Sequence, residues 1–216
     1  MINKILLIKT IVVSLLIITS CKKDDNIPID AGNDPNFTIV THSDNGFSSF
    51  SRKVVVFGID IYAVVAVEDA KLLHAANVMA QYLDNDEDGI VDDQLVLNKM
   101  IENKAFMVMW KNENDLNIDP PNGREGQDLG NDETHPNFVS NGKKGEFDAS
   151  LEEVLHIINN AGHSYAYPEA FGQKVGSDLA NAMDIARGGQ FMTIPNEYPI
   201  NAWYTYDDQT LSLIHI

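Results

Sequence analysis

The sequence has a single cysteine and few basic residues. The first shortage excludes an internal disulfide, and the second argues against a nucleic-acid partner. With Cys21 alone, no disulfide can form within the chain, so stability has to come from a hydrophobic core or a bound ion. Lysine and arginine total 15 against 32 aspartates and glutamates, a formal net charge of -17. Such a surface repels phosphate backbones, and we expect no nucleic-acid partner. Because 44% of the 216 residues are hydrophobic, wholesale disorder is excluded as well.

The first twenty residues have the features of a secretory signal. A basic start at Lys4 precedes the apolar stretch Ile5–Ile18, which is too short and too interrupted for a comfortable transmembrane helix. An aliphatic residue and two small residues at positions 18–20 then lead into Cys21. This pattern resembles the lipobox of bacterial lipoproteins, in which the cysteine is lipidated and becomes the first mature residue. The resemblance implies an exported protein anchored in a membrane through Cys21. A simple secretory signal followed by an unmodified cysteine is the alternative.

The residues after the cysteine indicate a location and a tether. Residues 22–25, Lys-Lys-Asp-Asp, resemble the signal that directs some Gram-negative lipoproteins to the outer cell surface. The resemblance implies an outer membrane lipoprotein displayed at the cell surface. Residues 24–36 are polar and include Pro28, Gly32 and Pro35, a composition typical of a flexible linker. We therefore expect a signal peptide at 1–20 and a lipidated cysteine with its tether at 21–36.

The last six residues, Leu211–Ile216, differ in character from the polar residues before them. They resemble the in-frame translation of a sequencing adapter. That resemblance implies a non-native tail at 211–216 and a natural protein that continues past Thr210. A genuine terminal strand is the alternative.

The hydrophobic pattern between these ends predicts a single globular α+β domain at 37–210, with a small sheet packed against about four helices. β-branched and aromatic runs predict strands or buried segments at Phe37–Thr41, Lys53–Phe57, Ile59–Val67 and Ala105–Trp110. Apolar residues at helical spacing predict helices near Glu68–Leu83, Asp92–Asn103, Ala149–Ala161 and Ser177–Arg187. The polar segment Lys111–Phe147 has little periodicity and is predicted to be a long loop.

The segment Asp84–Asp93 carries six carboxylates in ten residues, which repel one another unless a cation lies among them. With a predicted helix on each side, it resembles an EF-hand loop. The resemblance implies side-chain ligands at positions 1, 3, 5 and 9, a glycine at the sharp turn of position 6 and a main-chain carbonyl ligand at position 7. The residues at these positions are Asp84, Asp86, Asp88, Asp92, Gly89 and Ile90. Oxygen ligands in a flexible loop favour Ca²⁺.

One departure from the EF-hand pattern lowers the expected affinity. Position 12, normally a bidentate glutamate, is Leu95, although Asp93 at position 10 is available as a substitute. A missing bidentate ligand predicts binding in the ~10⁻⁴–10⁻³ M range of extracellular calcium modules. A lone loop lacks the paired hand of calcium sensors, so the pattern favours a structural ion. An acidic, solvated turn without metal is the alternative.

Glu152, Glu153 and His156 form a second constellation. Glu152 and His156 are four residues apart on a predicted helix and can bind one ion together. The segment resembles a degenerate copy of the His-Glu-x-x-His helix of zinc metallopeptidases, with Glu152 in place of the first histidine. The resemblance implies Glu152 and His156 as zinc ligands, Glu153 as the general base for a zinc-bound water, and His163 as a candidate third ligand.

A purely structural interpretation of the same helix is also available. Ser150 and Glu153 fit a capping box, and Gly162 fits a helix stop. Helical spacing predicts a buried side and a solvent-facing side. The buried side is formed by Leu151, Val154, Leu155, Ile157 and Ile158, and the solvent-facing side by Glu152, Glu153, His156, Asn159 and Asn160.

These patterns lead to three functional hypotheses. The leading one is a lipid-anchored cell-surface protein with one structural Ca²⁺ in the 84–93 loop. The second is a zinc-dependent hydrolase that uses the Glu-Glu-x-x-His helix. The third is a structural or partner-binding lipoprotein without metal. Residues 56–208 as a whole resemble secreted proteins of unknown activity that share both motifs, which leaves enzyme and non-enzyme, and protein and glycan partners, open.

Overall fold

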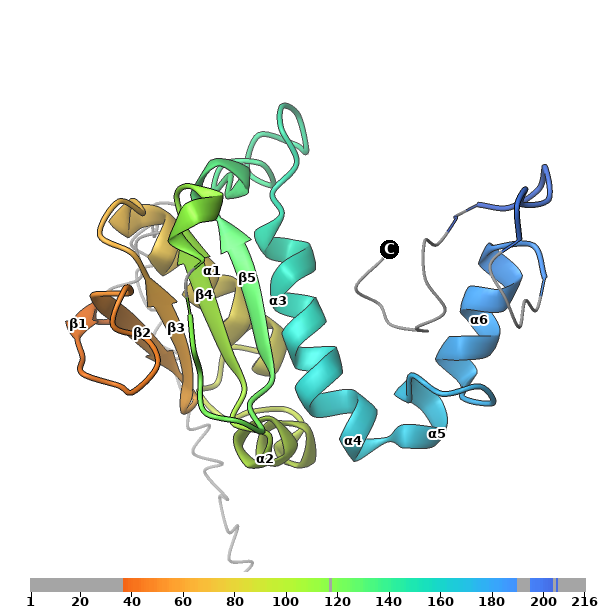
Figure 1. Ribbon diagram of the computed structural model, residues 1–216, viewed down its shortest axis with the longest axis horizontal. Coiled ribbons are helices and arrows are strands. Elements are labelled where there is room, and N and C mark those ends of the chain that lie inside the picture. The colour runs from red at the N-terminus through yellow and green to blue at the C-terminus, as the bar shows by residue number, and fades with distance from the viewer. Residues whose placement is uncertain (1–36, 117, 190–194, 204, 206–216) are drawn as a thin grey trace, which may run out of the picture.

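The computed structural model describes residues 37–116, 118–189, 195–203 and 205 (Figure 1). The predicted signal peptide, Cys21, the tether and the tail at 211–216 lie outside the described residues. In the part of the chain that is described, no helix has both the length and the apolar character that a membrane crossing requires.

The centre of the molecule is a five-stranded mixed sheet with the strand order β1-β2-β3-β4-β5. The first three strands are antiparallel, and β3, β4 and β5 run parallel to one another. The strands are Val40–Thr41 (β1), Arg52–Val56 (β2), Ile59–Ala63 (β3), Phe106–Trp110 (β4) and Gly126–Gly130 (β5). Together with the helices below, this sheet confirms the predicted α+β class.

The four predicted helices are present, with shifted ends. They are Asp69–Leu83 (α1), Gln94–Glu102 (α2), Ser150–Ile158 (α3) and Asp178–Ala186 (α6). A π-helical turn, Asn159–His163 (η3), and two short helices, Ser164–Ala166 (α4) and Pro168–Phe171 (α5), were not predicted. In Figure 1, α1 and α3 lie against the sheet, whereas α4, α5 and α6 extend away from it.

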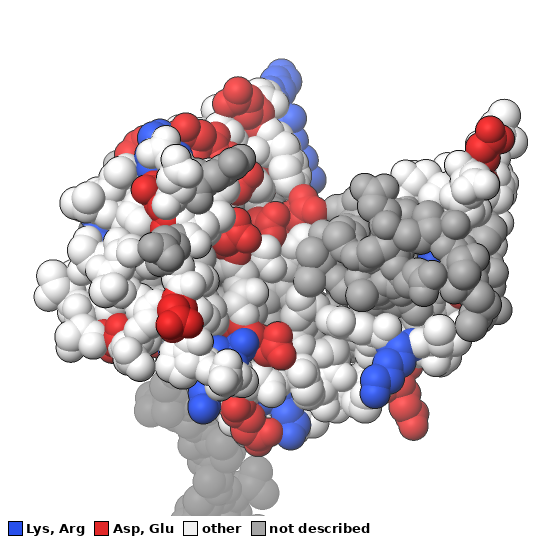
Figure 2. All heavy atoms as spheres, in the orientation of Figure 1, with Lys and Arg blue, Asp and Glu red and all other residues white. Residues whose placement is uncertain are grey.

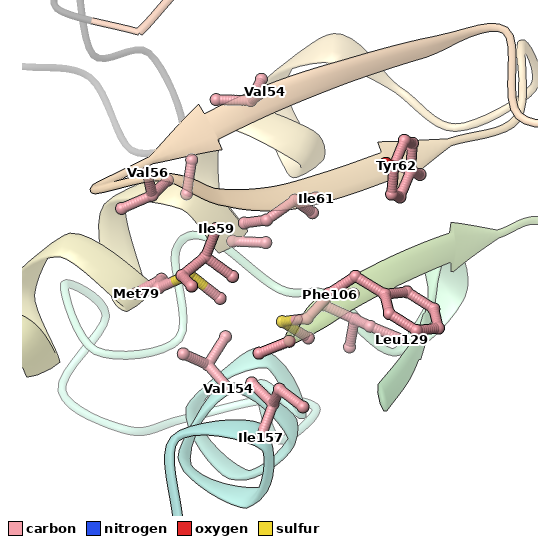
Figure 3. Close-up of a cluster of buried hydrophobic side chains, with 14 of the residues drawn as sticks. Val54, Val56, Ile59, Ile61, Tyr62, Met79, Phe106, Leu129, Val154 and Ile157 are labelled. Carbon is pink, nitrogen blue, oxygen red and sulfur yellow. The ribbon is translucent and has the colours of Figure 1, made fainter. Parts of the chain in front are cut away.

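The core lies between the sheet and the helices α1 and α3. The strand register places Ile61 opposite both Val54 and Met107, so these three side chains point to the same face of the sheet. Met79 of α1 and Val154 and Ile157 of α3 meet this face, as Figure 3 shows. Full burial of each such side chain contributes about 1.5–3 kcal/mol. The buried stripe of α1 extends to Leu83, and the acidic loop begins at the next residue.

Loops and aromatic rings cover the opposite face of the sheet. Phe47 stacks on Tyr62 with ring centroids 4.1 Å apart and meets Phe106 edge-on at 4.9 Å. The Tyr62 hydroxyl oxygen lies 2.9 Å from Asp44 Oδ2 and 3.0 Å from Asp60 Oδ2, so the two carboxylates share its single donor. Burial is the main cause that raises the pKa of Tyr62, and the two neighbouring carboxylates add to it. This network braces the β2–β3 face.

The prediction of an uninterrupted loop at Lys111–Phe147 is wrong, because this segment contains β5 and two short 3₁₀ helices, Glu113–Asp115 (η1) and Asn131–Glu133 (η2). The strand was missed because Gly-Gln-Asp-Leu-Gly has one large apolar residue, Leu129, and so no alternation to detect. Its glycines have a packing reason, since a Cβ at Gly126 would collide with the ring of Phe106. Pairing with β4 therefore selects the strand where propensity does not.

Candidate metal site

The acidic loop connects α1 to α2, and hydrogen bonds hold its two ends together. The N–H of Asp84 donates to the Ala80 carbonyl at 2.8 Å and so continues the last turn of α1. Across the loop, the N–H of Asp92 donates to the Leu83 carbonyl at 2.9 Å, and the N–H of Asn85 donates to Asp92 Oδ2 at 3.0 Å. These hydrogen bonds bring the first and last residues of the loop next to each other.

The side chain of Asp84 folds the middle of the loop. Asp84 exposes 7% of its surface, and its two carboxylate oxygens accept the N–H groups of Asp88 at 3.2 Å and Gly89 at 2.8 Å. Asp88 Oδ1 in turn accepts the N–H of Ile90 at 2.8 Å. Gly89 has a φ of 84°, in the left-handed region that favours glycine. The predicted sharp turn at this glycine is confirmed.

Three carboxylates of the loop converge. One oxygen each from Asp84, Asp86 and Asp88 lie within 4.8 Å of one another. The charge of Asp88 is the main cause that raises the pKa of Asp86, with smaller contributions from burial, Asp92 and Asp84. In the described part of the chain, no lysine, arginine or histidine forms an ion pair with these carboxylates. Backbone N–H groups offset only part of their mutual repulsion, and the group can hold a metal ion.

The other predicted calcium ligands occupy different environments. Asp92 Oδ2 accepts the N–H of Asn85. Ile90 exposes 68% of its surface, and its predicted ligand is the main-chain carbonyl. Asp93 lies outside the three-carboxylate group. Its Oδ1 accepts the N–H groups of Leu95 at 3.0 Å and Val96 at 3.1 Å, which caps the start of α2.

The second oxygen of Asp93 connects the loop to a distant part of the chain. The Tyr167 hydroxyl donates to Asp93 Oδ2 at 2.7 Å. This hydrogen bond is the main cause that lowers the pKa of Asp93, and it also raises the pKa of Tyr167. Tyr167 is the residue between α4 and α5. The end of the acidic loop is therefore attached to both α2 and the α4–α5 segment.

The predicted burial of the Glu-Glu-x-x-His helix is wrong at three positions. His156 and Asn159 were predicted to face solvent but expose 4% and 2% of their surfaces, whereas Leu155, predicted to be buried, exposes 41%. The reason is that α3 packs against α1 on one side and against β5 on another, so its buried surface is rotated from the one that the apolar residues alone define. Polar side chains at that second contact, such as Gln127 of β5 and Glu153 of α3, have no signal in a hydrophobic pattern.

Contacts around His156 involve both predicted glutamates. His156 Nδ1 lies 3.0 Å from Glu153 Oε2, and His156 Nε2 lies 3.8 Å from Glu152 Oε1. Gln127 of β5 donates from Nε2 to the same Glu153 oxygen at 2.6 Å. Among the described residues, Asp84, Asp86 and Asp88 form the one group of three or more potential ligands whose atoms converge, and Glu152, Glu153 and His156 do not form such a group.

His163 is not brought to this cluster. It belongs to the π-helical turn η3, and its ring lies 4.9 Å from the ring of Phe171. Burial lowers the pKa of His163, and the charge of Asp93 partly opposes this. The predicted helix stop at Gly162 is also wrong, because the helical backbone continues through η3 into α4. This glycine instead allows α2 to approach, since a Cβ there would lie 2.7 Å from Val96 Cγ1.

The predicted capping box at the start of α3 is wrong, and Asp148 takes its place. Ser150 donates from Oγ to Asp148 Oδ1 at 2.8 Å, and the N–H of His135 donates to the same oxygen at 3.0 Å. His74 of α1 lies 2.6 Å from Asp148 Oδ2. Burial raises the pKa of Asp148, but these hydrogen bonds outweigh it and lower the pKa overall. Sequence reasoning missed this junction because its three chain segments meet only in the folded state.

No family model matches the chain, and neither the curated proteins nor the solved structures contain a match to it.

Proposed function

We propose that the 84–93 loop binds one Ca²⁺, which stabilises the fold of a protein held at the outer cell surface by lipid on Cys21. The observation that carries the calcium site is the convergence of oxygens from Asp84, Asp86 and Asp88 within 4.8 Å of one another. The anchoring and the location are supported by the lipobox-like residues before Cys21 and by the tag at 22–25. Cations are the natural ligands of a chain with a net charge of -17.

The chemistry of the donors supports calcium over other divalent ions. Carboxylate and carbonyl oxygens select hard cations, and this loop offers no nitrogen or sulfur ligand for zinc. Two of the carboxylates, Asp86 and Asp88, are exposed and can adjust to the 2.3–2.6 Å oxygen distances of Ca²⁺. Mg²⁺ demands a nearly ideal octahedron at about 2.0–2.1 Å and gives up water reluctantly. A site with two exposed carboxylates that can adjust therefore suits calcium better.

The connections of the loop support a structural role for the ion. It would sit between α1, which packs against β2 and α3, and α2, which packs against η3 and α4. In the proposed EF-hand-like arrangement, α1 enters the loop and α2 leaves it. By neutralising the negative charge of the loop, the ion would hold Asp84 at the end of α1 and Asp93 at the start of α2 in fixed positions. The ion would then stabilise the junction between the sheet layer and the C-terminal helices.

Thermal unfolding of the full chain in EDTA and in about 10–100 mM Ca²⁺, which is about 100 times the expected dissociation constant of ~10⁻⁴–10⁻³ M, tests this proposal. At a free calcium concentration 100 times the dissociation constant, binding adds about 2.7 kcal/mol, which raises the melting temperature of a chain of this size by roughly 5–10 °C. The same concentration of Mg²⁺ should raise it less. A melting temperature that is equal in EDTA and in calcium would show that no stabilising site exists.

The second candidate is a zinc-dependent hydrolase or a degenerate relative of one. The distances of His156 from Glu152 and Glu153 favour it, since they place a potential pair of ligands and a potential base on one helix. Within the described residues, no third ligand converges with this pair. Elemental analysis of the purified full chain separates the candidates. Zinc near one equivalent, lost in His156→Ala, supports the hydrolase; zinc-free protein excludes it.

A further inference from the structure

A cavity of about 610 Å³ lies between the segment that precedes β5 and the chain from η3 to α5. Its volume is in the ~300–1,000 Å³ range of small-molecule sites. The residues that give it chemical character are Glu125, Asn160, Tyr165, Pro168, Gln173 and Lys174. None of them belongs to the acidic loop or to the Glu152, Glu153 and His156 cluster, so the cavity is separate from both.

The polar groups of the cavity form a matched set of hydrogen-bond donors and acceptors. Gln173 Nε2 donates to Asn160 Oδ1 at 2.6 Å. Within the described residues, the amide nitrogen of Asn160 and the amide oxygen of Gln173 make no further hydrogen bond, so the pair offers a donor and an acceptor. The Tyr165 hydroxyl donates to one oxygen of Glu125 at 3.3 Å, which leaves the second carboxylate oxygen as an acceptor. Vicinal hydroxyl groups, which both donate and accept, complement such a set.

Apolar surface accompanies these groups. Tyr165 exposes 49% of its surface beside Pro168, and an exposed aromatic ring packs well against the C–H face of a sugar ring. The lining holds one carboxylate and one ammonium group, from Glu125 and Lys174, and so carries no net charge. Figure 2 shows acidic and basic side chains mixed along the lower side of the molecule, where α4 and α5 lie. A lining without net charge suits a neutral ligand.

The backbone at the cavity wall is unusual as well. Asn160 lies in the π-helical turn η3, and Ser164, which follows that turn, donates from Oγ to the Asn160 carbonyl at 2.6 Å. π-Helical turns are rare and are frequent at functional sites. Next to Asn160, the buried amide nitrogen of Asn159 has no hydrogen-bond partner among the described residues. The fold tolerates this unsatisfied donor in the same turn that presents Asn160 to the cavity.

We propose that the cavity beside η3, α4 and α5 binds one unit of a neutral saccharide. The ring of Tyr165 stacks on the sugar, and the Asn160–Gln173 amide pair and the free oxygen of Glu125 bind its hydroxyl groups. The site does not depend on a metal in the 84–93 loop. It gives a chain with a predicted position at the cell surface a ligand-capture role.

A printed array of neutral and anionic glycans, probed with the full chain, tests this proposal. We expect binding to neutral glycans and none to sulfated or sialylated ones. Calorimetry with a neutral trisaccharide that scores on the array should then show a loss of affinity of about tenfold or more in Tyr165→Ala and in Asn160→Ala. Tyr165→Phe should keep most of the affinity, because the ring remains.

A matched control exists on α2. Gln94 Nε2 donates to Asn98 Oδ1 at 3.0 Å, so these residues form an equivalent amide pair on an exposed helix face outside the cavity. Asn98→Ala should leave the affinity within about twofold of the wild-type value. The proposal is overturned if no neutral glycan binds, if anionic glycans or a triglycine peptide bind instead, or if binding survives both Tyr165→Ala and Asn160→Ala.

Discussion

Replacing Asp84 with alanine should destabilise the protein by an amount that depends on calcium. In EDTA the variant loses two hydrogen bonds, from the N–H groups of Asp88 and Gly89. Both donors are in exposed residues and can bind water, so each bond contributes about 1 kcal/mol. Relief of the repulsion between Asp84 and its neighbouring carboxylates offsets part of this loss. We expect a net destabilisation of about 1–2 kcal/mol in EDTA.

Calcium should increase the difference in free energy of unfolding between the wild type and Asp84→Ala. At 100 times the dissociation constant the wild type gains about 2.7 kcal/mol and the variant gains nothing, so the difference grows to roughly 4 kcal/mol. Urea denaturation, followed by circular dichroism in EDTA and in calcium, measures both differences. Asp115→Ala is the matched control, since Asp115 also accepts two backbone N–H bonds, from Lys111 and Asn112, but lies outside the carboxylate group. If Asp84→Ala lowers the free energy of unfolding by the same amount in EDTA and in calcium, the reasoning is refuted.

Three further variants test separate parts of the account. Asp86→Asn removes repulsion with Asp88, so its melting temperature should be no lower than that of the wild type in EDTA but lower in calcium; a drop in both conditions would contradict this. Asp148→Asn should lower the free energy of unfolding, measured by urea denaturation at neutral pH, by roughly 3 kcal/mol. Because the folded pKa of Asp148 is lowered, its stabilisation is present above pH 3.8 and disappears as the pH falls through the folded pKa, so the variant should approach the wild type in acid; a constant gap would contradict this. Gly162→Ala should cost about 1 kcal/mol, since the clash with Val96 outweighs the gain in helix propensity, and a more stable variant would show that α2 does not approach as described.

Several features of the fold could be predicted because local patterns determine them. Leu72, Ala76, Met79 and Leu83 recur at helical spacing and are buried in α1, and the apolar run at Phe106–Trp110 forms β4. The sharp turn at Gly89 follows from a position that needs a positive φ. These elements make their main contacts with the core through the same residues that produce the sequence pattern.

Other features depend on contacts between distant segments and have no local signal. His156 is buried because α3 packs against both α1 and β5, and no periodicity within α3 indicates that second contact. Gly162 sits inside a continuous helical segment because α2 approaches it closely, although glycine usually ends helices. Within the acidic loop, spacing alone placed Asp93 beside the ligands, whereas its two oxygens cap α2 and accept a bond from Tyr167.

Calorimetric titration of Ca²⁺ into the full chain tests the central claim most directly, with the double variant Asp86→Asn/Asp88→Asn as its reference. Both side chains are exposed, so their replacement leaves the core intact. The account predicts one binding event per wild-type chain, with a dissociation constant on the order of 10⁻⁴–10⁻³ M, and none in the double variant. An absence of binding to the wild type, or equal binding to both proteins, would contradict it.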